Sequence, residues 1–269
     1  MVLENTVGRR KLKPLAAIGR GSGKFTNATG DMMLLFLRAC YWLKELPRNL
    51  PSVFRQVSFI GVSTLPIAAV MALFVGMVLA LQTGYQLLQF RQLRVQEYVG
   101  AIVGLSMAKE LGPVMTAYLL AGRVGAAITA EIGSMAVSEE IDALKVMGIN
   151  PVRFLAMPRL VACTLSLPLL VIYSELIGIM GGALVATTYV DIPTKVYFDN
   201  MLIVMSVKEI SNGLVKALVF GTIVGVVGCY QGFTTTGGAT GVGRATTRSV
   251  VTSFMLILIA DYFLWRMLW

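Results

Sequence analysis

The sequence predicts an all-α integral membrane protein, and the observations behind this prediction are its composition and its long apolar runs. Of its 269 residues, 56% are hydrophobic and only 14% are charged, with a mean hydropathy of +0.75. Ordinary soluble domains are far more polar. Several runs approach the roughly 20 apolar residues that a helix needs to cross a bilayer. The alternating short segments of a membrane β-barrel are absent, so we expect helices to satisfy the backbone hydrogen bonds in lipid.

The first 56 residues are basic and precede the first long apolar run. Residues 1–56 hold ten Lys or Arg, a bias that is typical of cytoplasmic segments beside membrane spans. Residues 31–46 are apolar but are interrupted by Arg38 and Lys44 and followed by Pro47. We therefore predict a cytoplasmic N-terminus with an interfacial amphipathic helix at about 31–46 that ends before Pro47. A short first span is the alternative.

Five transmembrane helices are predicted to follow, in a single domain over residues 57–269. Their expected bounds are about 57–81, 99–134, 154–187, 213–231 and 250–269, with polar loops at 89–96, 189–210 and 232–249. An odd number of spans places the C-terminus outside when the N-terminus is inside. The loops assigned to the inside then carry basic residues, in agreement with the positive-inside rule: Lys145, Arg153, Arg159, Arg244 and Arg248. A short helix at about 137–148, between spans two and three, is expected on the same cytoplasmic side.

The second predicted span is unusual because it keeps charged residues. Residues 105–133, LSMAKELGPVMTAYLLAGRVGAAITAEIG, include Lys109, Glu110, Arg123 and Glu131. A charge inside the bilayer costs at least ~2.5 kcal/mol, so it normally faces a cavity or a partner. Glu110 is therefore expected to face a polar cavity. Compensation by Lys109 is the alternative, although adjacent residues on a helix do not face each other.

The other charges within the spans are assigned structural roles. Arg123 and Glu131 are eight residues apart, near the inner end of the span, where an ion pair or contact with lipid headgroups is expected. Asp261 in the last span is also predicted to be a structural charge, and Glu175 in the third span has no assigned role. Glycine and alanine at four-residue spacing over 121–130 predict close helix packing, either inside one subunit or between two copies.

Several function classes are disfavoured by the residues themselves. The chain has no His, which excludes His-dependent catalysis and His-ligated metal sites, and no other metal site is predicted. The three cysteines stand singly in apolar surroundings and form no CxxC pair. The stretches GRGSGKFT (19–26) and GATGVGRAT (238–246) depart from the P-loop pattern, and neither follows a buried strand. We therefore expect no ATP site, no cofactor and no enzymatic activity in this chain.

The longest motifs of the chain resemble those of a known family, the MlaE-type permeases (MlaE/YrbE family). These motifs are KELGPVMTAYLLAGRVGAAITAEIGSM, EEIDALKVMGINP at 139–151, GMVLALQTGY in the first span and GRATTRSVV at 243–251. The resemblance extends from about residue 55 to the end. Members of this family are the membrane subunits of ABC transporters that move lipids together with MCE (mammalian cell entry) proteins.

The resemblance implies an oligomeric state, partners and a location. It implies a homodimer in the bacterial inner (cytoplasmic) membrane, with cytoplasmic N-termini and periplasmic C-termini. A cytoplasmic ABC ATPase dimer would bind ATP and Mg, and a periplasmic ring of MCE-domain proteins would lie above the permease. A STAS-domain regulator accompanies the ATPase in some members. The implied substrate is glycerophospholipid, moved between inner and outer membranes in outer-membrane maintenance and lipid asymmetry. No nucleic acid is expected as a partner.

The resemblance also implies roles for particular residues. A lipid pathway would be lined by two charged residues and by apolar residues near the end of the first span: Glu110, Lys109, Leu79, Tyr85, Leu87 and Leu88. Many relatives have arginine at position 109, and lysine lacks the bidentate fork with which arginine binds phosphate. The segment 137–148 would be a coupling helix that receives the movement of the ATPase, through Glu139, Glu140, Ile141, Asp142, Leu144, Met147 and Gly148.

An ion-coupled secondary transporter is the alternative function. Glu110, Glu175 and Asp261 would then act as relay carboxylates within the membrane. Such a protein would transport without nucleotide, and it would need no partner at 137–150.

Overall fold

The computed structural model describes residues 29–88 and 98–268, and the regular structure in these residues is helical throughout. Five helical segments are long and apolar enough to cross a membrane: Leu50–Leu87, Val99–Val137, Val152–Tyr189, Val207–Phe233 and Gly238–Leu268. This confirms the predicted all-α membrane class with five spans. The GRGSGKFT stretch and the predicted loop at 89–96 lie outside the described residues.

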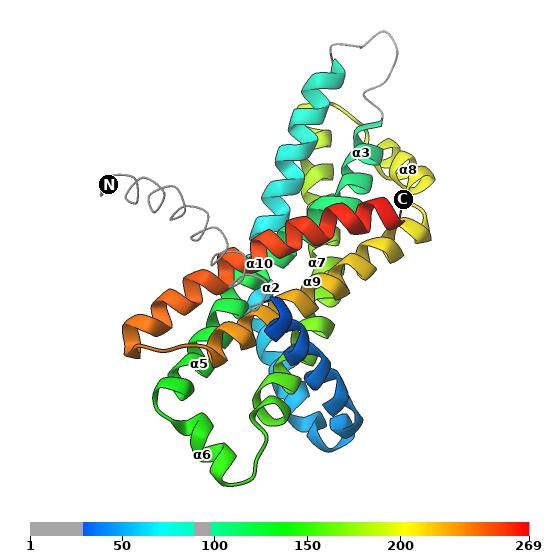
Figure 1. Ribbon diagram of the computed structural model, residues 1–269. Helices are drawn as coiled ribbons and strands as arrows, with labels where there is room; N and C mark the ends of the chain where they lie inside the picture. The colour runs from blue at the N-terminus through cyan, green and yellow to red at the C-terminus, as the bar shows by residue number, and fades with distance from the viewer. Residues whose placement is uncertain (1–28, 89–97, 269) are drawn as a thin grey trace, which may run out of the picture.

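The first described helix, which we call the N-terminal helix, covers residues 29–41. A 3₁₀ turn, Trp42–Glu45, connects it to α2 (Leu46–Leu88), and the chain changes direction there (Figure 1). The N-terminal helix thus ends at residue 41, five residues before the expected end at 46. Pro47 is the second residue of α2, where its missing N–H is not needed. α2 begins before the predicted first span, at residue 46 and not at 57, and it ends after that span, at residue 88 and not at 81.

The second span is one helical rod with two π-helical stretches. The rod consists of α3 (Val99–Ser106), η4 (Met107–Leu111), α4 (Gly112–Leu120), η5 (Ala121–Gly125) and α5 (Ala126–Val137). π-helical turns inside α-helices are rare and are frequently found at functional sites. A regular 3.6-residue period gives no sign of them, so they were not predicted. They carry three of the four charges singled out in this span.

The rest of the described chain forms the last three spans and the short helices that precede them. α6 (Glu140–Val146) and the π-helical η6 (Val152–Ala156) lead into α7 (Met157–Tyr189), and α8 (Thr194–Val204) precedes α9 (Val207–Phe233) and α10 (Gly238–Leu268). α6 and α8 lie at opposite ends of the molecule (Figure 1).

Two expected loops are largely helical. The segment 189–210 contains α8, which is fixed by Tyr197: this fully buried side chain donates a hydrogen bond from its hydroxyl to the carbonyl oxygen of Ile179, at 3.3 Å. The segment 232–249 is helical from Gly238 onward, although it is rich in glycine and threonine. Ala245 and Ser249 are buried there, because α10 packs on α9 and α5, and this packing overrides weak helix propensity.

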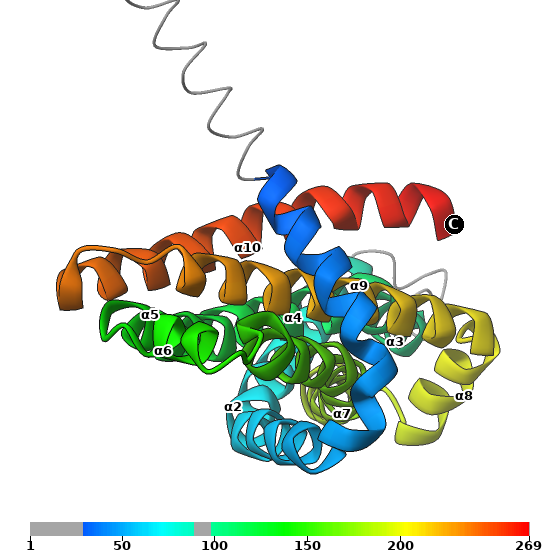
Figure 2. The same cartoon turned by 60° about the horizontal axis from the view of Figure 1, so that its bottom comes forward.

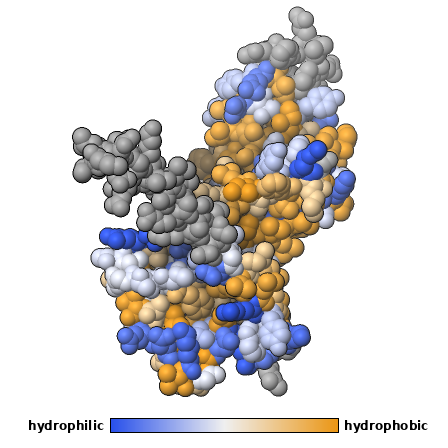
Figure 3. Space-filling model, in the orientation of Figure 1, coloured by the Kyte–Doolittle hydropathy of each residue, from blue (hydrophilic) through white to orange (hydrophobic). Residues whose placement is uncertain are grey.

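The spans form three layers, seen in Figure 2 from the α6 end. α2 and α7 pack against each other and form the first layer, and the second-span rod lies with α9 in the next. α10 forms the outer layer across α9 and α5. Only one row of its residues is buried, at four-residue spacing: Ala245, Ser249, Ser253, Ile257 and Asp261. In Figure 3, apolar surface covers much of the spans, and hydrophilic residues gather toward both ends of the molecule.

Glycines set the distance between neighbouring helices at two places. A Cβ on Gly76 of α2 would lie 1.9 Å from the carbonyl oxygen of Gly178 on α7, so these backbones touch. A Cβ on Gly213 of α9 would lie 2.4 Å from the carbonyl oxygen of Ala108 in η4. The second contact brings α9 directly against the π-helical stretch that carries Lys109 and Glu110.

Candidate functional site

The centre of the candidate site is Lys216 of α9, which the sequence analysis did not single out. Its side chain is fully buried. The Nζ atom lies 2.8 Å from Oε2 of Glu110 and 2.8 Å from Oδ1 of Asp261, and it donates a hydrogen bond to the carbonyl oxygen of Lys109 at 3.1 Å. The contacts with Glu110 and with the carbonyl oxygen of Lys109 are hydrogen bonds, and the contact with Asp261 is an ion pair. We call Lys216, Glu110 and Asp261 the Lys216 triad.

The triad joins three elements that are distant in sequence: η4, α9 and α10. Lys109, the neighbour of Glu110 in η4, also reaches α9, where its Nζ lies 3.3 Å from Oε2 of Glu209. Glu209 and Lys216 are seven residues, or about two helical turns, apart and so share one face of α9. Each charge of η4 therefore has a partner on α9: Glu209 for Lys109 and Lys216 for Glu110.

Glu175 of α7 lies close to the triad but is not part of it. Its side chain packs beside Gly112, the residue after η4: a Cβ on Gly112 would lie 3.2 Å from Oε1 of Glu175. The same Oε1 atom would lie 3.6 Å from a Cβ on Gly213. Glu175 is 7% exposed, and this oxygen has no hydrogen-bond partner among the described residues. The two glycines leave room for a buried carboxyl group where η4, α7 and α9 meet.

The triad holds three charged groups close together. One ammonium faces two carboxylates, so the ionised triad keeps one excess negative charge. The Glu110 side chain is 43% exposed, which places part of this charge at the surface of the single chain. Within the described part of the chain, no group of three or more Cys, Asp or Glu is placed to hold a metal ion. The site can therefore hold a polar or cationic group beside apolar surface.

The charges nearer the α6 end have separate partners. Arg123 of η5 donates from Nη1 to Oγ1 of Thr64 on α2, at 2.9 Å. Glu131 of α5 pairs with Arg159 of α7, which is 5% exposed, at 2.5 Å. Both interactions are formed between spans. They connect the second-span rod to α2 on one side and to α7 on the other. Of the two expectations for Arg123 and Glu131, an ion pair or contact with lipid headgroups, the ion pair between their side chains is not found among the described residues.

The expected coupling residues divide between the two sides of α6. Ile141 is buried and Leu144 is partly buried, and both pack against the core of this chain. Val146 and Met147 are 88% and 64% exposed. The polar residues also face outward, and Asp142 pairs with Lys145 at 2.7 Å. Ile141 and Leu144 therefore anchor the helix, and Val146 and Met147 form its free apolar surface.

Two residues in the left-handed conformation delimit α6. Glu139 precedes it with φ 61°, and Gly148 follows it with φ 76°. Glycine adopts this conformation without steric cost, but a glutamate does so rarely. Gly148 is therefore suited to a sharp exit from the helix, and the turn at Glu139 is held by the packing of α6.

The apolar residues assigned to the lipid pathway lie toward the α8 end. Leu79 and Leu87 are partly buried and pack against the core cluster that contains Val103, and Tyr85 is 57% exposed. Leu88 is the last residue of α2, and its side chain lies outside what the structure describes. The structure thus places these residues near the end of α2, in a different core cluster from the one around α9 and α10.

Lys216 and its partners could have been found by one rule. A lysine within an apolar run needs a carboxylate partner in the membrane, and Glu110 and Asp261 are acids within other spans. Arg159 and Glu209 were missed for a different reason, because both were assigned to the ends or loops of the spans.

Comparisons with known proteins agree with this architecture. The family Permease MlaE matches residues 53–267. A probable ABC transporter permease protein of Rickettsia felis is 39% identical over 248 residues, which cover 91% of this chain and 94% of that protein. Similar proteins of the same description are found in Rickettsia prowazekii, at 38% over 253 residues (93% and 96%), and in Synechocystis sp., at 38% over 220 residues (81% and 82%). The chain therefore belongs to the MlaE permease family, as the multi-pass membrane subunit of an ABC transporter whose ATPase is a separate protein.

Proposed function

We propose that this permease moves glycerophospholipid between the inner and outer membranes of a bacterium, together with a periplasmic MCE-domain protein. The observation that carries the proposal is the Lys216 triad, a fixed polar site at the edge of an apolar membrane surface. Phospholipids need apolar surface for their chains and polar groups for their headgroups, and such mixed sites suit them. Membership of the MlaE permease family supports the same substrate class.

The working unit in this proposal is a homodimer in the inner membrane. The outward face of α10 exposes apolar side chains such as Met255, Leu258 and Tyr262, at 59%, 57% and 71%. A second copy that covered this face would enclose the exposed part of Glu110 in a cavity between the two chains. Lys109, which stays paired with Glu209, lies at the rim of that cavity.

The ATPase dimer is proposed to bind α6 from the cytoplasm, where Val146 and Met147 offer apolar surface for a groove on the partner. This orientation puts the N-terminus on the cytoplasmic side and the C-terminus on the periplasmic side. ATP-driven closure of the ATPase would move α6, and the core contacts of Ile141 and Leu144 would pass the movement to the spans. A STAS-domain regulator would bind the ATPase and not this chain.

The first experiment is to purify the tagged chain from its native membrane in mild detergent and to identify what accompanies it by mass spectrometry. We expect a P-loop ATPase, an MCE-domain protein and glycerophospholipid. Recovery of the chain with an ATPase but with no MCE-domain protein and no lipid would overturn the proposed substrate and partner.

An ion-coupled secondary transporter remains a second candidate because Glu175 is buried with an unpartnered oxygen in a span. The two candidates differ in energy source. The complex in liposomes should transfer lipid only with ATP. Transfer that is driven by an ion gradient alone, and is abolished by Glu175→Gln, would favour the secondary transporter.

A further inference from the structure

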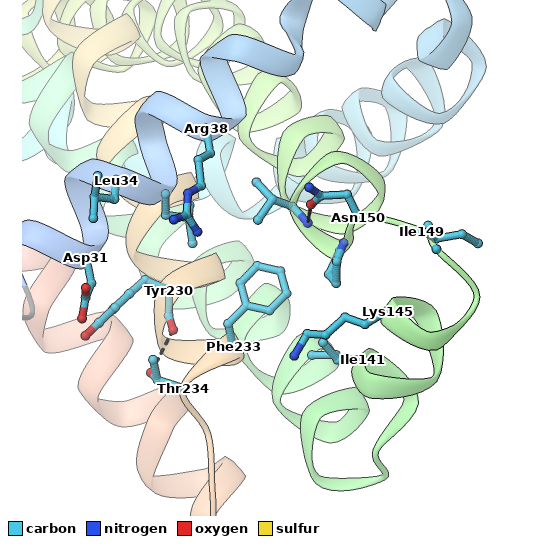
Figure 4. Close-up of a pocket in the computed structure, with 14 residues that line it drawn as sticks. Asp31, Leu34, Arg38, Ile141, Lys145, Ile149, Asn150, Tyr230, Phe233 and Thr234 are labelled. Carbon is cyan, nitrogen blue, oxygen red and sulfur yellow. Dashed lines mark hydrogen bonds between the residues drawn. The ribbon is translucent and has the colours of Figure 1, made fainter.

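A cleft at the α6 end of the molecule forms a second candidate binding site, distant from the Lys216 triad. We propose that it binds the headgroup of a membrane phospholipid that carries both a phosphate and a primary amine, as phosphoethanolamine does. The cleft encloses about 650 Å³, in the size range of small-molecule sites. Its walls come from the N-terminal helix, from α6 with the segment that follows it, and from the end of α9 (Figure 4).

The charged groups of the cleft are separated into a basic end and an acidic end. Arg38 of the N-terminal helix and Lys145 of α6 point into the cleft from two walls (Figure 4). Asp31 lies at the other end, beside the phenol of Tyr230. Asp31 and Arg38 are seven residues apart on one helix, or about 10 Å. Leu34 and Phe233 lie between the two ends.

This separation matches a zwitterion. The guanidinium of Arg38 presents a fork of N–H donors that suits phosphate, and Lys145 adds a second positive charge. Lys145 also pairs with Asp142, but both side chains are well exposed, at 60% and 71%, and such pairs contribute at most about 1 kcal/mol. An ammonium has three N–H donors, so Lys145 can bind the phosphate and Asp142 at the same time. Asp31 is placed to accept a hydrogen bond from a primary amine.

The surroundings of the cleft favour a lipid over an acidic protein segment. The N-terminal helix exposes Met33, Leu37 and Tyr41, at 59%, 54% and 64%, next to Arg38. On another side of the same helix, an apolar crevice of about 280 Å³ lies against α9 and α10, lined by Phe36, Ile223 and Val226 among others. Along α9, this crevice lies deeper in the span than the cleft, which reaches Phe233 and Thr234. Polar groups at the end of a span and apolar groups below them are typical of a membrane interface.

The lipid in this cleft would be bound beside α6 and would not be the transported cargo. Its binding therefore goes beyond the proposed function and does not depend on which cargo is transported. A headgroup in the cleft would bridge the N-terminal helix and α6. The lipid would thus link the coupling helix to the membrane surface.

The test is native mass spectrometry of the detergent-purified complex, titrated with phosphatidylethanolamine or with phosphatidylglycerol of the same chains. We expect the wild type to bind phosphatidylethanolamine more tightly, and Arg38→Gln to weaken this binding about tenfold, as for the loss of one charged hydrogen bond. Asp31→Asn should abolish the preference between the two lipids. Lys195→Gln, which removes an exposed lysine from α8 at the opposite end, is the matched control and should leave binding unchanged.

Three outcomes would overturn the proposal. Equal binding of the two lipids by the wild type would show that the amine is not recognised. Displacement by soluble glycerophosphoethanolamine as effective as by the lipid would mean that the ligand is a free phosphate ester. Unchanged lipid binding in Arg38→Gln and Arg38→Glu, with loss of the ATPase from the latter complex, would make the cleft a protein docking surface. The helical content of each variant, measured by circular dichroism, excludes unfolding as the cause.

Discussion

Lys216 is a fully buried cation that is surrounded by oxygens from η4 and α10. Taking an ammonium out of water is costly, and the cost is offset only when its partners are well placed. The two carboxylates of the triad depend on the same ammonium. Loss of the lysine would therefore leave Glu110 and Asp261 facing each other with nothing between them.

Lys216→Met is expected to lower the free energy of unfolding by about 3–5 kcal/mol, the usual cost of breaking a buried ion pair from one side. The measurement is the thermal unfolding of the purified protein in detergent. The control is Lys195→Met, an exposed lysine on α8, which should unfold like the wild type. Equal stability of the two variants would mean that the triad does not hold the three elements together.

Glu110→Gln is expected to reduce lipid transfer about tenfold or more while the complex still assembles. Glutamine keeps the shape and can still accept a hydrogen bond from Lys216, but it removes the excess negative charge of the triad. Transfer between liposomes by the reconstituted complex measures the effect. Glu209→Gln changes the neighbouring carboxylate, which pairs with Lys109 outside the triad, and should have the smaller effect. The reverse order would place the functional charge at Glu209.

At the scale of elements, α6 shows how a short helix can be both anchored and exposed. Its inner side belongs to the core of the chain through Ile141 and Leu144, and its outer side ends in Val146 and Met147. Leu144→Asp would therefore disturb the packing of the permease itself. The side chains that test partner binding are the exposed ones.

The double substitution Val146→Asp and Met147→Asp is expected to abolish binding of the ATPase without lowering the stability of the permease. Both side chains are more than half exposed, so aspartate costs little in the free chain but would be buried without a partner in the complex. Pull-down of the ATPase by the tagged permease measures binding. Leu144→Asp serves as the contrast, since it should lower stability by about 1–3 kcal/mol. Normal pull-down by the double variant would move the docking surface away from α6.

Gly76→Leu is expected to prevent the packing of α2 on α7. A Cβ at position 76 would lie 1.9 Å from the carbonyl oxygen of Gly178 on α7. Because this clash is with backbone atoms, it can be relieved only if the two helices move apart. Gly61→Leu, on the same helix, meets no atom within 4 Å of its Cβ and is the matched control. The yield of monodisperse protein should fall sharply for the first variant and stay normal for the second. Equal yields would show that α2 can shift freely along α7.

At the scale of the whole molecule, α10 is the span with the least contact to its own chain. One row of its residues is buried, and large apolar side chains are exposed on the part from Val251 to Met267. Lipid can cover such a face, but so can a second copy of the chain, as in the proposed homodimer.

A cysteine at Leu258 of α10 is expected to form a disulfide or short cross-link between two copies in the membrane. Leu169→Cys on α7 is the control, because it has a similar exposure of 62% but lies away from the α10 face. Both variants should carry Cys40→Ser, since the other native cysteines, Cys163 and Cys229, are fully buried and unreactive. Non-reducing electrophoresis measures the dimer. A dimer only for Leu169→Cys would place the interface on the other side.

Much of this fold follows from composition and apolar runs, because a span needs a fixed length of apolar helix whatever its sequence. The carboxylates Glu110 and Asp261 could also be found, since charges within such runs are costly. Lys216 was missed because one lysine hardly changes the mean hydropathy of a long run. The π-helical turns and the helical start of α10 could not be predicted, because both depend on packing against other helices and not on local propensity.

The single buried row of α10 has a consequence for how this protein can vary over evolution. Positions 245, 249, 253, 257 and 261 allow little change, since each is closed in by neighbouring helices. The residues between them can drift freely if only lipid covers them. A complete substitution scan of α10 should then show tolerance that rises and falls every four residues. A second intolerant row on the opposite side would be the mark left by a partner chain.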